Sequence, residues 1–269
     1  MATPATCSSS AFSSLSLKVD LVENLSSLGY ESMTPIQAKT LPEMLQGNDV
    51  IGEAKTGSGK TAAFGLALLN KLDVKRFRIQ SMVLCPTREL ADQVAKELRK
   101  LARAIHNIKI LTLCGGTPFG PQIGSLEHGA HIIVGTPGRI EEHVIKGTLK
   151  LDNLNVLVLD EADRMLEMGF QAALDNIVER TPIERQTLLF SATFPPQIKL
   201  ISDSIMTDPV MVKVALSENK STITQQFYKV NDDNERIEAL RLLLLDSSVE
   251  STVIFCNTKK DTQQVADSL

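Results

Sequence analysis

The feature that most constrains this chain is a glycine-containing loop held between an apolar run and a helical run. Residues 49–52 are patterned as a short buried strand, and residues 61–72 are rich in Ala and Leu, as in a buried helix. The loop between them fits A-x-x-x-x-G-K-T and consists of Ala54, Lys55, Thr56, Gly57, Ser58, Gly59, Lys60 and Thr61. A linker of Gly and Ser is the alternative, but linkers are not normally held between a strand and a helix.

The residue types in this loop indicate phosphate chemistry. Glycines let backbone N–H groups turn inward around phosphate oxygens. Lys60 supplies a point charge for the β- and γ-phosphates, and the Thr61 hydroxyl is a ligand for Mg²⁺. The loop therefore predicts a site for a nucleoside triphosphate with magnesium.

A second apolar run, 156–160, ends in Asp160, Glu161, Ala162 and Asp163. We expect Asp160 to hold Mg²⁺ through water and Glu161 to orient or deprotonate the attacking water. The alternative is an acidic helix start, which the helix dipole favours by itself. Beside a phosphate-binding loop, the catalytic interpretation is the stronger one.

Apolar runs alternate with helical patterns along most of the chain. Several runs are apolar at consecutive positions, as in a parallel sheet that is covered on both faces. The run 88–105 places apolar residues on one helical face. This rhythm predicts a doubly wound α/β domain with ligands at the carboxyl ends of the strands. Besides 156–160, the predicted strands are 81–85, 109–113, 131–135, 187–190 and 210–214.

Composition shifts predict the domain boundaries. Residues 1–11 are expected to be a disordered tail, 12–214 the first domain and 215–224 a polar linker. Residues 225–269 begin a second α/β unit, with strands at 225–230 and 252–256 and helices at 234–245 and 259–269. Two strands are too few to complete a doubly wound sheet, so this unit is expected to be incomplete.

Composition limits the partners of the chain. No apolar run is long enough to cross a bilayer, so no membrane partner is expected. The net charge is −4, and any affinity for nucleic acid must come from a local basic surface. The cysteines show no C-x-x-C spacing; Cys85, Cys114 and Cys256 are expected to be buried hydrophobes in a reducing cytoplasm, without disulfide-linked partners. We expect a cytoplasmic monomer.

From Phe12 onward the chain resembles the DEAD-box family of ATP-dependent RNA helicases. Residues 29–37 (GYESMTPIQ) resemble the Q motif of that family, and Phe12 lies upstream where members carry an isolated aromatic residue. The resemblance implies that Gln37 hydrogen-bonds adenine and that Phe12 stacks on its ring. A glutamine amide donates and accepts at once, as the N6 and N7 edge of adenine requires, so ATP is the expected nucleotide. The implied fold is a RecA-like P-loop NTPase domain followed by an incomplete second RecA-like lobe.

Two predicted helix starts carry an arginine beside a threonine, and helix N-termini attract phosphate. Simple capped helices with surface arginines are the alternative. A pair of glycines elsewhere permits close approach of a ligand. These segments resemble the PTREL, GG and TPGR motifs of the family, which implies contacts with the RNA backbone that are independent of base sequence. The residues are Pro86, Thr87, Arg88, Gly115, Gly116, Thr136, Pro137, Gly138 and Arg139.

Ser191 and Thr193 resemble the SAT motif, which implies hydroxyl hydrogen bonds to Asp163 that couple the nucleotide to RNA. Strings such as LCPTRELADQVA resemble the DbpA-like group, whose members carry an RNA-recognition domain for ribosomal RNA. That likeness implies RNA remodelling in ribosome biogenesis.

The later family motifs that supply arginines from the second lobe do not occur in this sequence. Such arginines are typically worth about 10³–10⁵ in rate, so the chain alone is expected to bind ATP and hydrolyse it very slowly. The alternatives are a truncated regulatory fragment without catalytic duty, or another P-loop ATPase such as a DNA helicase or transporter subunit.

Overall fold

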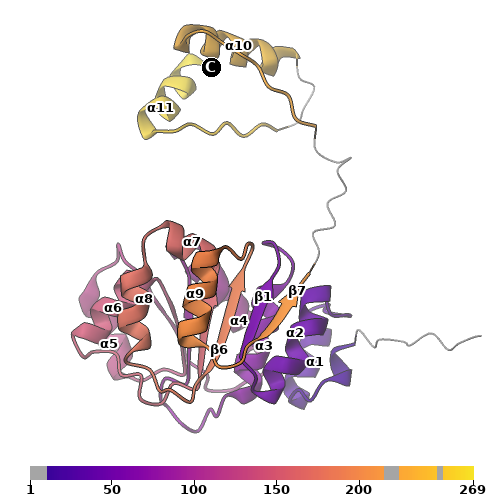
Figure 1. Ribbon diagram of the computed structural model, residues 1–269, viewed down its shortest axis with the longest axis vertical. Helices are drawn as coiled ribbons and strands as arrows, with labels where there is room; N and C mark the ends of the chain where they lie inside the picture. The colour runs from indigo at the N-terminus through magenta and orange to yellow at the C-terminus, as the bar shows by residue number, and fades with distance from the viewer. Residues whose placement is uncertain (1–10, 215–223, 247–250) are drawn as a thin grey trace, which may run out of the picture. The chain divides into compact units, whose positions relative to one another are not determined.

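The computed structural model describes residues 11–214, 224–246 and 251–269 (Figure 1). These residues fall into two compact units that divide within the undescribed stretch 215–223. Apart from one residue each, the predicted tail and the predicted linker lie outside the described residues.

The first unit is built on a seven-stranded sheet in the order β3-β4-β2-β5-β6-β1-β7. Each neighbouring pair is parallel, for example β5 with β6 in the register Val156↔Gln186. The predicted doubly wound α/β fold is therefore confirmed. The strands are β1 (Val50–Glu53), β2 (Ser81–Leu84), β3 (Ile110–Leu113), β4 (Ile132–Gly135), β5 (Val156–Asp160), β6 (Gln186–Ser191) and β7 (Val210–Lys213).

Helices cover both faces of this sheet, as the consecutive apolar positions predict. The described helices of the unit are the short η1 (Phe12–Ser14), α1 (Val19–Ser27), α2 (Pro35–Gln46), α3 (Lys60–Lys71), α4 (Arg88–Leu101), α5 (Phe119–Glu127), α6 (Pro137–Ile145), α7 (Ala162–Glu167), α8 (Gln171–Val178) and α9 (Pro196–Ile205). Helix α4 ends four residues before the predicted 105, because Ala102 already stands at its C-cap.

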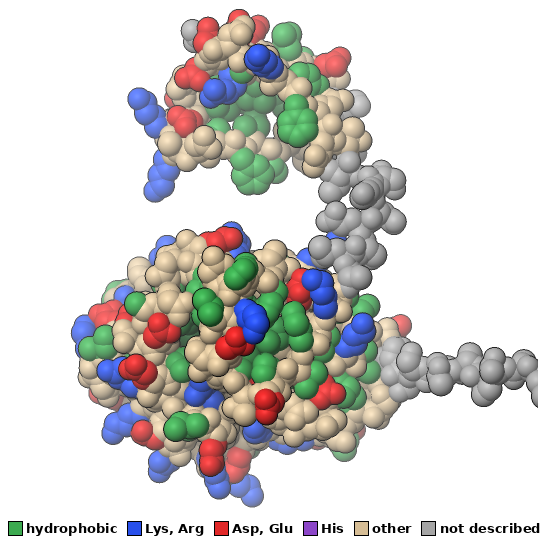
Figure 2. Space-filling model, viewed as in Figure 1, with side chains coloured by type: hydrophobic (Ala, Val, Ile, Leu, Met, Phe, Trp, Pro, Cys, Tyr) green, Lys and Arg blue, Asp and Glu red, His purple; other side chains and the backbone are tan. Residues whose placement is uncertain are grey.

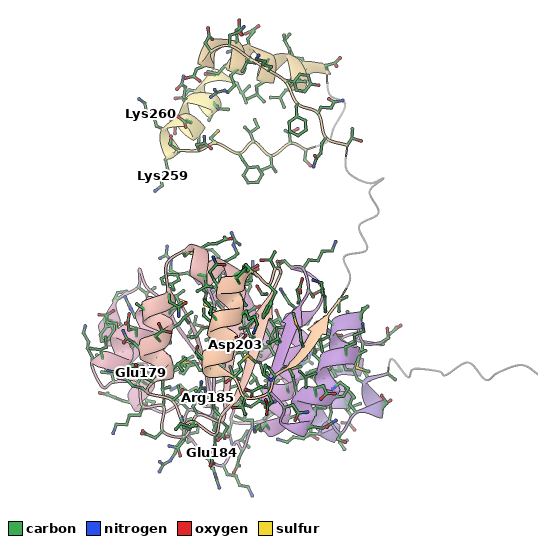
Figure 3. All side chains as sticks on the ribbon, viewed as in Figure 1. Glu179, Glu184, Arg185, Asp203, Lys259 and Lys260 are labelled. Atoms are coloured by element: carbon green, nitrogen blue, oxygen red, sulfur yellow. The ribbon has the colours of Figure 1, made fainter. Side chains whose placement is uncertain are left out.

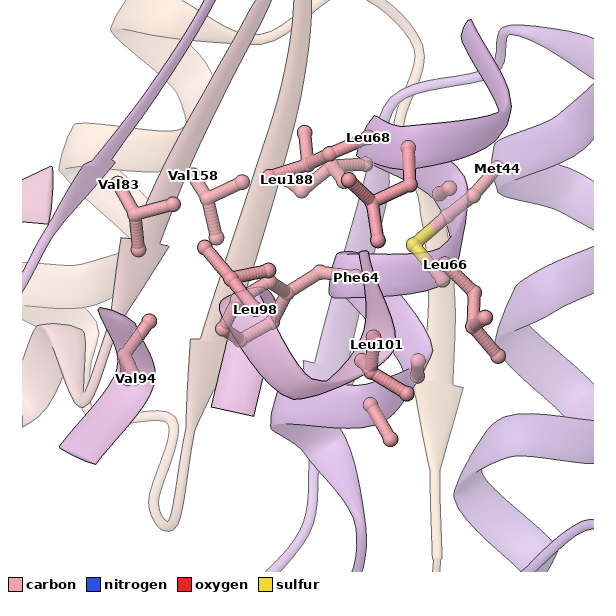
Figure 4. Close-up of a cluster of buried hydrophobic side chains, with 14 of the residues drawn as sticks. Met44, Phe64, Leu66, Leu68, Val83, Val94, Leu98, Leu101, Val158 and Leu188 are labelled. Carbon is pink, nitrogen blue, oxygen red and sulfur yellow. The ribbon is translucent and has the colours of Figure 1, made fainter. Parts of the chain in front are cut away.

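Two hydrophobic cores lie on opposite sides of the sheet, because successive side chains of a strand point to opposite faces. Val156 and Val158 pack with α1–α4 in one core, whereas Leu157 and Leu159 pack with α6–α9 in the other. Figure 4 shows the first core, where Phe64 of α3 lies fully buried among leucine and valine side chains. This packing fixes the carboxyl ends of β5 and β6, where Asp160 and Ser191 lie.

Polar contacts also hold the opposite side of the sheet, where the strands begin. The guanidinium of Arg185, which precedes β6, donates to the carbonyls of Pro182 at 2.9 Å and Ile205 at 3.2 Å (Figure 3). Because Ile205 is the last residue of α9, a cation at this position also suits the helix dipole.

The second unit contains the two predicted helices, as α10 (Asp233–Asp246) and α11 (Lys259–Ser268). The predicted strands 225–230 and 252–256 are wrong for the described residues, which form no strand there. A strand is stabilised by its neighbours, and these two segments neither pair together nor meet a sheet. Phe227 and Phe255 are each 93 % exposed, and Figure 2 shows hydrophobic side chains on the surface of this unit.

The cysteine predictions hold in part. Cys85 and Cys114 are buried, and burial raises the pKa of the Cys114 thiol to about 11. Cys256 is only half-buried, because the strand predicted to enclose it does not form. Cys85, Cys114 and Cys256 are free thiols. Within the described ranges, no helix combines the length and hydrophobicity that a membrane span requires.

Candidate nucleotide and nucleic-acid sites

The predicted catalytic segments meet because of the strand order. Strand β6 lies between β5 and β1, and all three are parallel. Their carboxyl ends deliver Asp160, Ser191 and the loop after Glu53 to one edge of the sheet. Residues more than a hundred positions apart in sequence are thereby placed side by side.

A cavity of about 520 Å³ opens at this edge. Its size is in the range of small-molecule and cofactor sites. Both the phosphate-binding loop and the end of β5 line it, so Lys60 and Asp160 lie on the same cavity, as the sequence interpretation requires. The lining residues are Tyr30, Ser32, Thr34, Gln37, Thr56, Gly57, Gly59, Lys60, Thr61, Ala62, Leu90, Gln93, Val94, Glu97, Asp160 and Glu161.

The phosphate-binding loop requires its glycines. Gly57 and Gly59 have φ angles of 81° and 94°, a region that other residues rarely adopt. A Cβ atom on Gly59 would stand 2.6 Å from the amide nitrogen of Gln37. The buried Ser58 hydroxyl has no hydrogen-bond partner among the described residues, which suits an oxygen-rich ligand.

Lys60 and Asp160 form the charged centre of the cavity. Lys60 is 5 % exposed and its Nζ donates to the carbonyl of Ala54 at 2.8 Å. Burial raises the pKa of Asp160 to about 6, and the neighbouring Lys60 charge opposes this rise. With Thr61 on the same cavity, a hydroxyl and a carboxylate are available, and such oxygen donors suit Mg²⁺.

Glu161 is held in a strained conformation at the start of α7. Its φ of 52° lies in the left-handed region, and such strain clusters at functional sites. Its Oε1 accepts a hydrogen bond from Thr56 Oγ1 at 3.2 Å, and its Oε2 lies 3.4 Å from Arg164 Nη1. The general-base candidate is thus oriented by the phosphate-binding loop on one side and a cation on the other.

Asp163 connects this edge to the segment after β6, as the resemblance implied. Its Oδ2 accepts from the Thr193 hydroxyl at 2.8 Å and from the Thr193 N–H at 3.0 Å, while its own N–H donates to Ser191 Oγ at 3.3 Å. Burial alone would raise the pKa of Asp163, but the hydrogen bonds from Thr193 and Ser191 lower it overall. The carboxylate is therefore charged and fixed.

Gln37, the predicted adenine contact, is held by the protein. Its Oε1 accepts from the Thr34 N–H at 2.8 Å and its Nε2 donates to the Gly59 carbonyl at 3.0 Å. One lone pair and one N–H of the amide are left for a base. Phe12 is 4 % exposed and lies edge-on to Tyr30, outside the residues that line the cavity. Its stacking on adenine stays a prediction.

Several lining residues were missed by the sequence reasoning, among them Tyr30, Gln93 and Glu97. Tyr30 stands within the Q-like segment and could have been noticed, since its aromatic ring lines the same cavity as Gln37. Gln93 and Glu97 lie on α4, and only packing of α4 beside the loop brings them to the cavity.

The first predicted RNA segment matches its expected local geometry. Thr87 caps α4, because its hydroxyl accepts from the Leu90 N–H at 3.2 Å. Arg88 is exposed and its Nη1 donates to the Gly115 carbonyl at 3.4 Å, while Pro86 is buried. Gly116 has a φ of 76° and lies against the same guanidinium.

The second segment differs in detail. Helix α6 begins at Pro137, as predicted, but the Thr136 side chain makes no capping hydrogen bond. The reason is that the Arg139 N–H, which such a cap would use, is donated to the Thr136 carbonyl at 3.2 Å. The Arg139 side chain is 12 % exposed and is engaged by Thr117, Gln122 and Glu142. Gly138 is exposed beside it.

Comparison with known proteins decides between the P-loop families. The sequence model of the DEAD/DEAH box helicases matches residues 34–201. This chain belongs to the DEAD/DEAH box helicase family. The RecA-like nature of the first unit follows, and the alternative of an unrelated P-loop ATPase is excluded.

Other members of the family show which part of a helicase this chain corresponds to. It is 55 % identical to the ATP-dependent RNA helicase DbpA of Escherichia coli (strain K12), over 96 % of this chain and 57 % of that protein. It is 43 % identical to the DEAD-box ATP-dependent RNA helicase CshA of Geobacillus kaustophilus (strain HTA426), over 96 % of this chain and 55 % of CshA. A DEAD box protein from the hyperthermophile Methanococcus jannaschii superposes with a TM-score of 0.73 at 38 % identity, covering 96 % and 69 % of the two chains. The chain thus spans about half the length of these curated relatives.

Proposed function

We propose that this chain is the ATP- and RNA-binding part of an ATP-dependent RNA helicase, which couples ATP hydrolysis to local unwinding of RNA. The observation that carries the proposal is the convergence of Lys60, Asp160 and Glu161 on one cavity beside the Asp163–Thr193 contact. The relatives named above are ATP-dependent RNA helicases, which supports the same assignment.

Their positions support the following proposed roles for these residues. Thr61 and Asp160 would hold Mg²⁺, which neutralises charge on the phosphates when it is bound. Lys60 contacts the phosphate oxygens, and Glu161 orients the attacking water and takes its proton. Because Asp163 is bonded to Thr193, a shift of the strand end on hydrolysis is passed to the segment after β6.

RNA is proposed to lie against Arg88, the loop at Gly115 and Gly116, and the start of α6 around Arg139. These groups offer positive charges and helix N-termini, which contact phosphate and sugar and do not distinguish between bases. On the likeness to DbpA we propose ribosomal RNA as the substrate and ribosome biogenesis as the process, with the protein acting as a cytoplasmic monomer.

The nucleotide part of the proposal is tested by titrating the chain with a fluorescent ATP analogue in the presence of Mg²⁺. Lys60→Ala should abolish binding, whereas Glu161→Gln should retain it, because Lys60, unlike Glu161, supplies positive charge to the phosphates. Unchanged ATP affinity in Lys60→Ala would refute the phosphate role.

The RNA part is tested by anisotropy of a labelled single-stranded RNA at low salt, compared with DNA of the same sequence. Arg88→Ala should weaken binding, and Arg103→Ala is the matched control, since Arg103 lies just beyond the opposite end of α4. Equal losses in the two variants, or tighter binding of DNA, would contradict the proposed surface. ATP binding without any RNA binding would favour a nucleotide-binding fragment of regulatory function.

A further inference from the structure

The proposed RNA surface has two arms, the Gly115–Gly116 loop and the start of α6 around Arg139, and Gln122, which no motif includes, links them. Gln122 lies on α5, between the loop that follows β3 and the start of α6. Its amide makes four hydrogen bonds, two to the loop and two to α6. A side-chain amide has two N–H donors and two acceptor lone pairs, so this capacity is fully used.

The two donated bonds hold the loop. Gln122 Nε2 donates to the Cys114 carbonyl at 3.1 Å and to the Thr117 hydroxyl at 2.7 Å. These partners flank Gly115 and Gly116, whose backbone is proposed to approach RNA. Arg88 contacts the same loop through the Gly115 carbonyl, so the position of the loop also affects the first phosphate site.

The two accepted bonds hold α6. Gln122 Oε1 accepts from Arg139 Nη1 at 2.9 Å and faces His143 Nε2 at 2.9 Å. Arg139 Nη1 also donates to the Thr117 carbonyl at 3.0 Å, so arginine and loop are fixed together. The guanidinium can only donate and the Cys114 carbonyl can only accept, which fixes the orientation of the amide.

His143 also helps to orient the Gln122 amide. Because Oε1 is an acceptor, His143 must present Nε2 as an N–H, and its Nδ1 lies 2.8 Å from the Thr148 hydroxyl. The ring is fully buried and stacks on Phe119, with centroids 4.1 Å apart. Burial lowers the pKa of His143 to about 4, so the ring is neutral near pH 7 and its Nδ1 accepts from the Thr148 hydroxyl.

We propose that Gln122 is a positioning residue that sets the distance and orientation between the Gly115–Gly116 loop and Arg139, so that both engage one RNA backbone. The inference rests on the proposed RNA binding and adds to it a residue outside the known motif segments. Gln122 does not itself need to contact RNA. Its loss leaves both arms and the contact of Arg139 with the Thr117 carbonyl present, but removes the four amide hydrogen bonds that set their relative orientation.

The test measures RNA affinity, ATP affinity and the ring nitrogens of His143 by NMR in the 269-residue chain. Gln122→Met removes all four hydrogen bonds at similar volume. Gln122→Glu keeps both acceptors for α6 and loses both donors to the loop. Gln171→Met and Gln171→Glu are the matched controls, because Gln171 lies on α8 and its amide donates to Asp175 of the same helix.

We expect Gln122→Met to weaken RNA binding by at least about fivefold, with ATP affinity unchanged and the His143 nitrogen signals shifted. Combined with Arg139→Ala it should add little further loss, since Gln122 acts partly through Arg139. Gln122→Glu, which keeps the α6 contacts, should also lose RNA affinity relative to Gln171→Glu. Normal RNA binding in both Gln122 variants, or losses fully additive with Arg139→Ala, would overturn the inference. A wild-type chain that binds ATP but no RNA would instead refute the proposed function, and the inference with it.

Discussion

Gly116 offers a sharp test of how the RNA surface is built. It stands in the left-handed region with a φ of 76°, and a Cβ atom there would lie 2.0 Å from Arg88 Nη1 and 3.0 Å from its Cζ. Gly115, the preceding residue, has no atom within 4 Å of its hypothetical Cβ and no positive φ. The two glycines thus form a matched pair in which only Gly116→Ala introduces strain.

The expected magnitude has two parts. The left-handed conformation costs a residue with a Cβ about 1 kcal/mol, which in a domain of this size lowers the Tm by about 2–4 °C. The guanidinium is the end of a flexible, exposed side chain, so Arg88 moves away and loses the Gly115 carbonyl. If one phosphate contact is lost, the slope of log Kobs against log salt for single-stranded RNA should flatten by about 0.7.

The assay combines thermal unfolding with RNA anisotropy over a series of salt concentrations, for both alanine variants. Gly115→Ala should leave the Tm and the salt slope unchanged, even if its methyl group weakens RNA binding by obstruction. Two variants with the same Tm and the same slope would refute the assigned roles of Gly116 and Arg88.

Three further predictions concern stability and titration. Phe64→Ala should lower the free energy of unfolding by about 3–5 kcal/mol in urea titrations, because the ring is fully buried and lies 5.5 Å from that of Phe190; a loss below about 1 kcal/mol would contradict this packing. Burial raises the pKa of Asp160 from 3.8 to about 6, so the folded chain holds an extra proton between about pH 4 and 6 and stability falls as pH rises through that window. Asp160→Asn should therefore be the more stable protein at pH 8, by roughly 3 kcal/mol at most, with the gain vanishing below about pH 4; a gain that is independent of pH would count against it. Burial lowers the pKa of His143 to about 4, so stability should fall as pH drops from 6.5 toward 4, and NMR titration should show a neutral ring at pH 5; a protonated ring at that pH would contradict the effect assigned to burial.

Local patterns were sufficient to predict much of this protein. The AKTGSGKT loop needs glycines at positive φ and a lysine at the helix start, and consecutive residues of the sequence meet these requirements. Consecutive apolar positions such as 156–159 predict a strand covered on both faces, and β5 begins and ends where expected. The cap at Thr87 is likewise a property of one short segment.

The strand pairing in the second unit could not be predicted in the same way. A β-type sequence becomes a strand only when a partner supplies the ladder hydrogen bonds, and residues 225–230 and 252–256 meet none in the described part of the chain. Their composition was correct for a strand, but pairing is a property of the neighbours.

The sequence by itself was enough to predict which residues would bind phosphate, because backbone conformation and charge at a loop depend on its own residues. Only the tertiary structure decided what stands around them. The order of β5, β6 and β1 brings Asp160 to Lys60, packing of α4 brings Glu97 to the cavity, and four hydrogen bonds make Gln122 a link between two arms. Such contacts join residues distant in sequence, and no local pattern encodes a distance between separate elements.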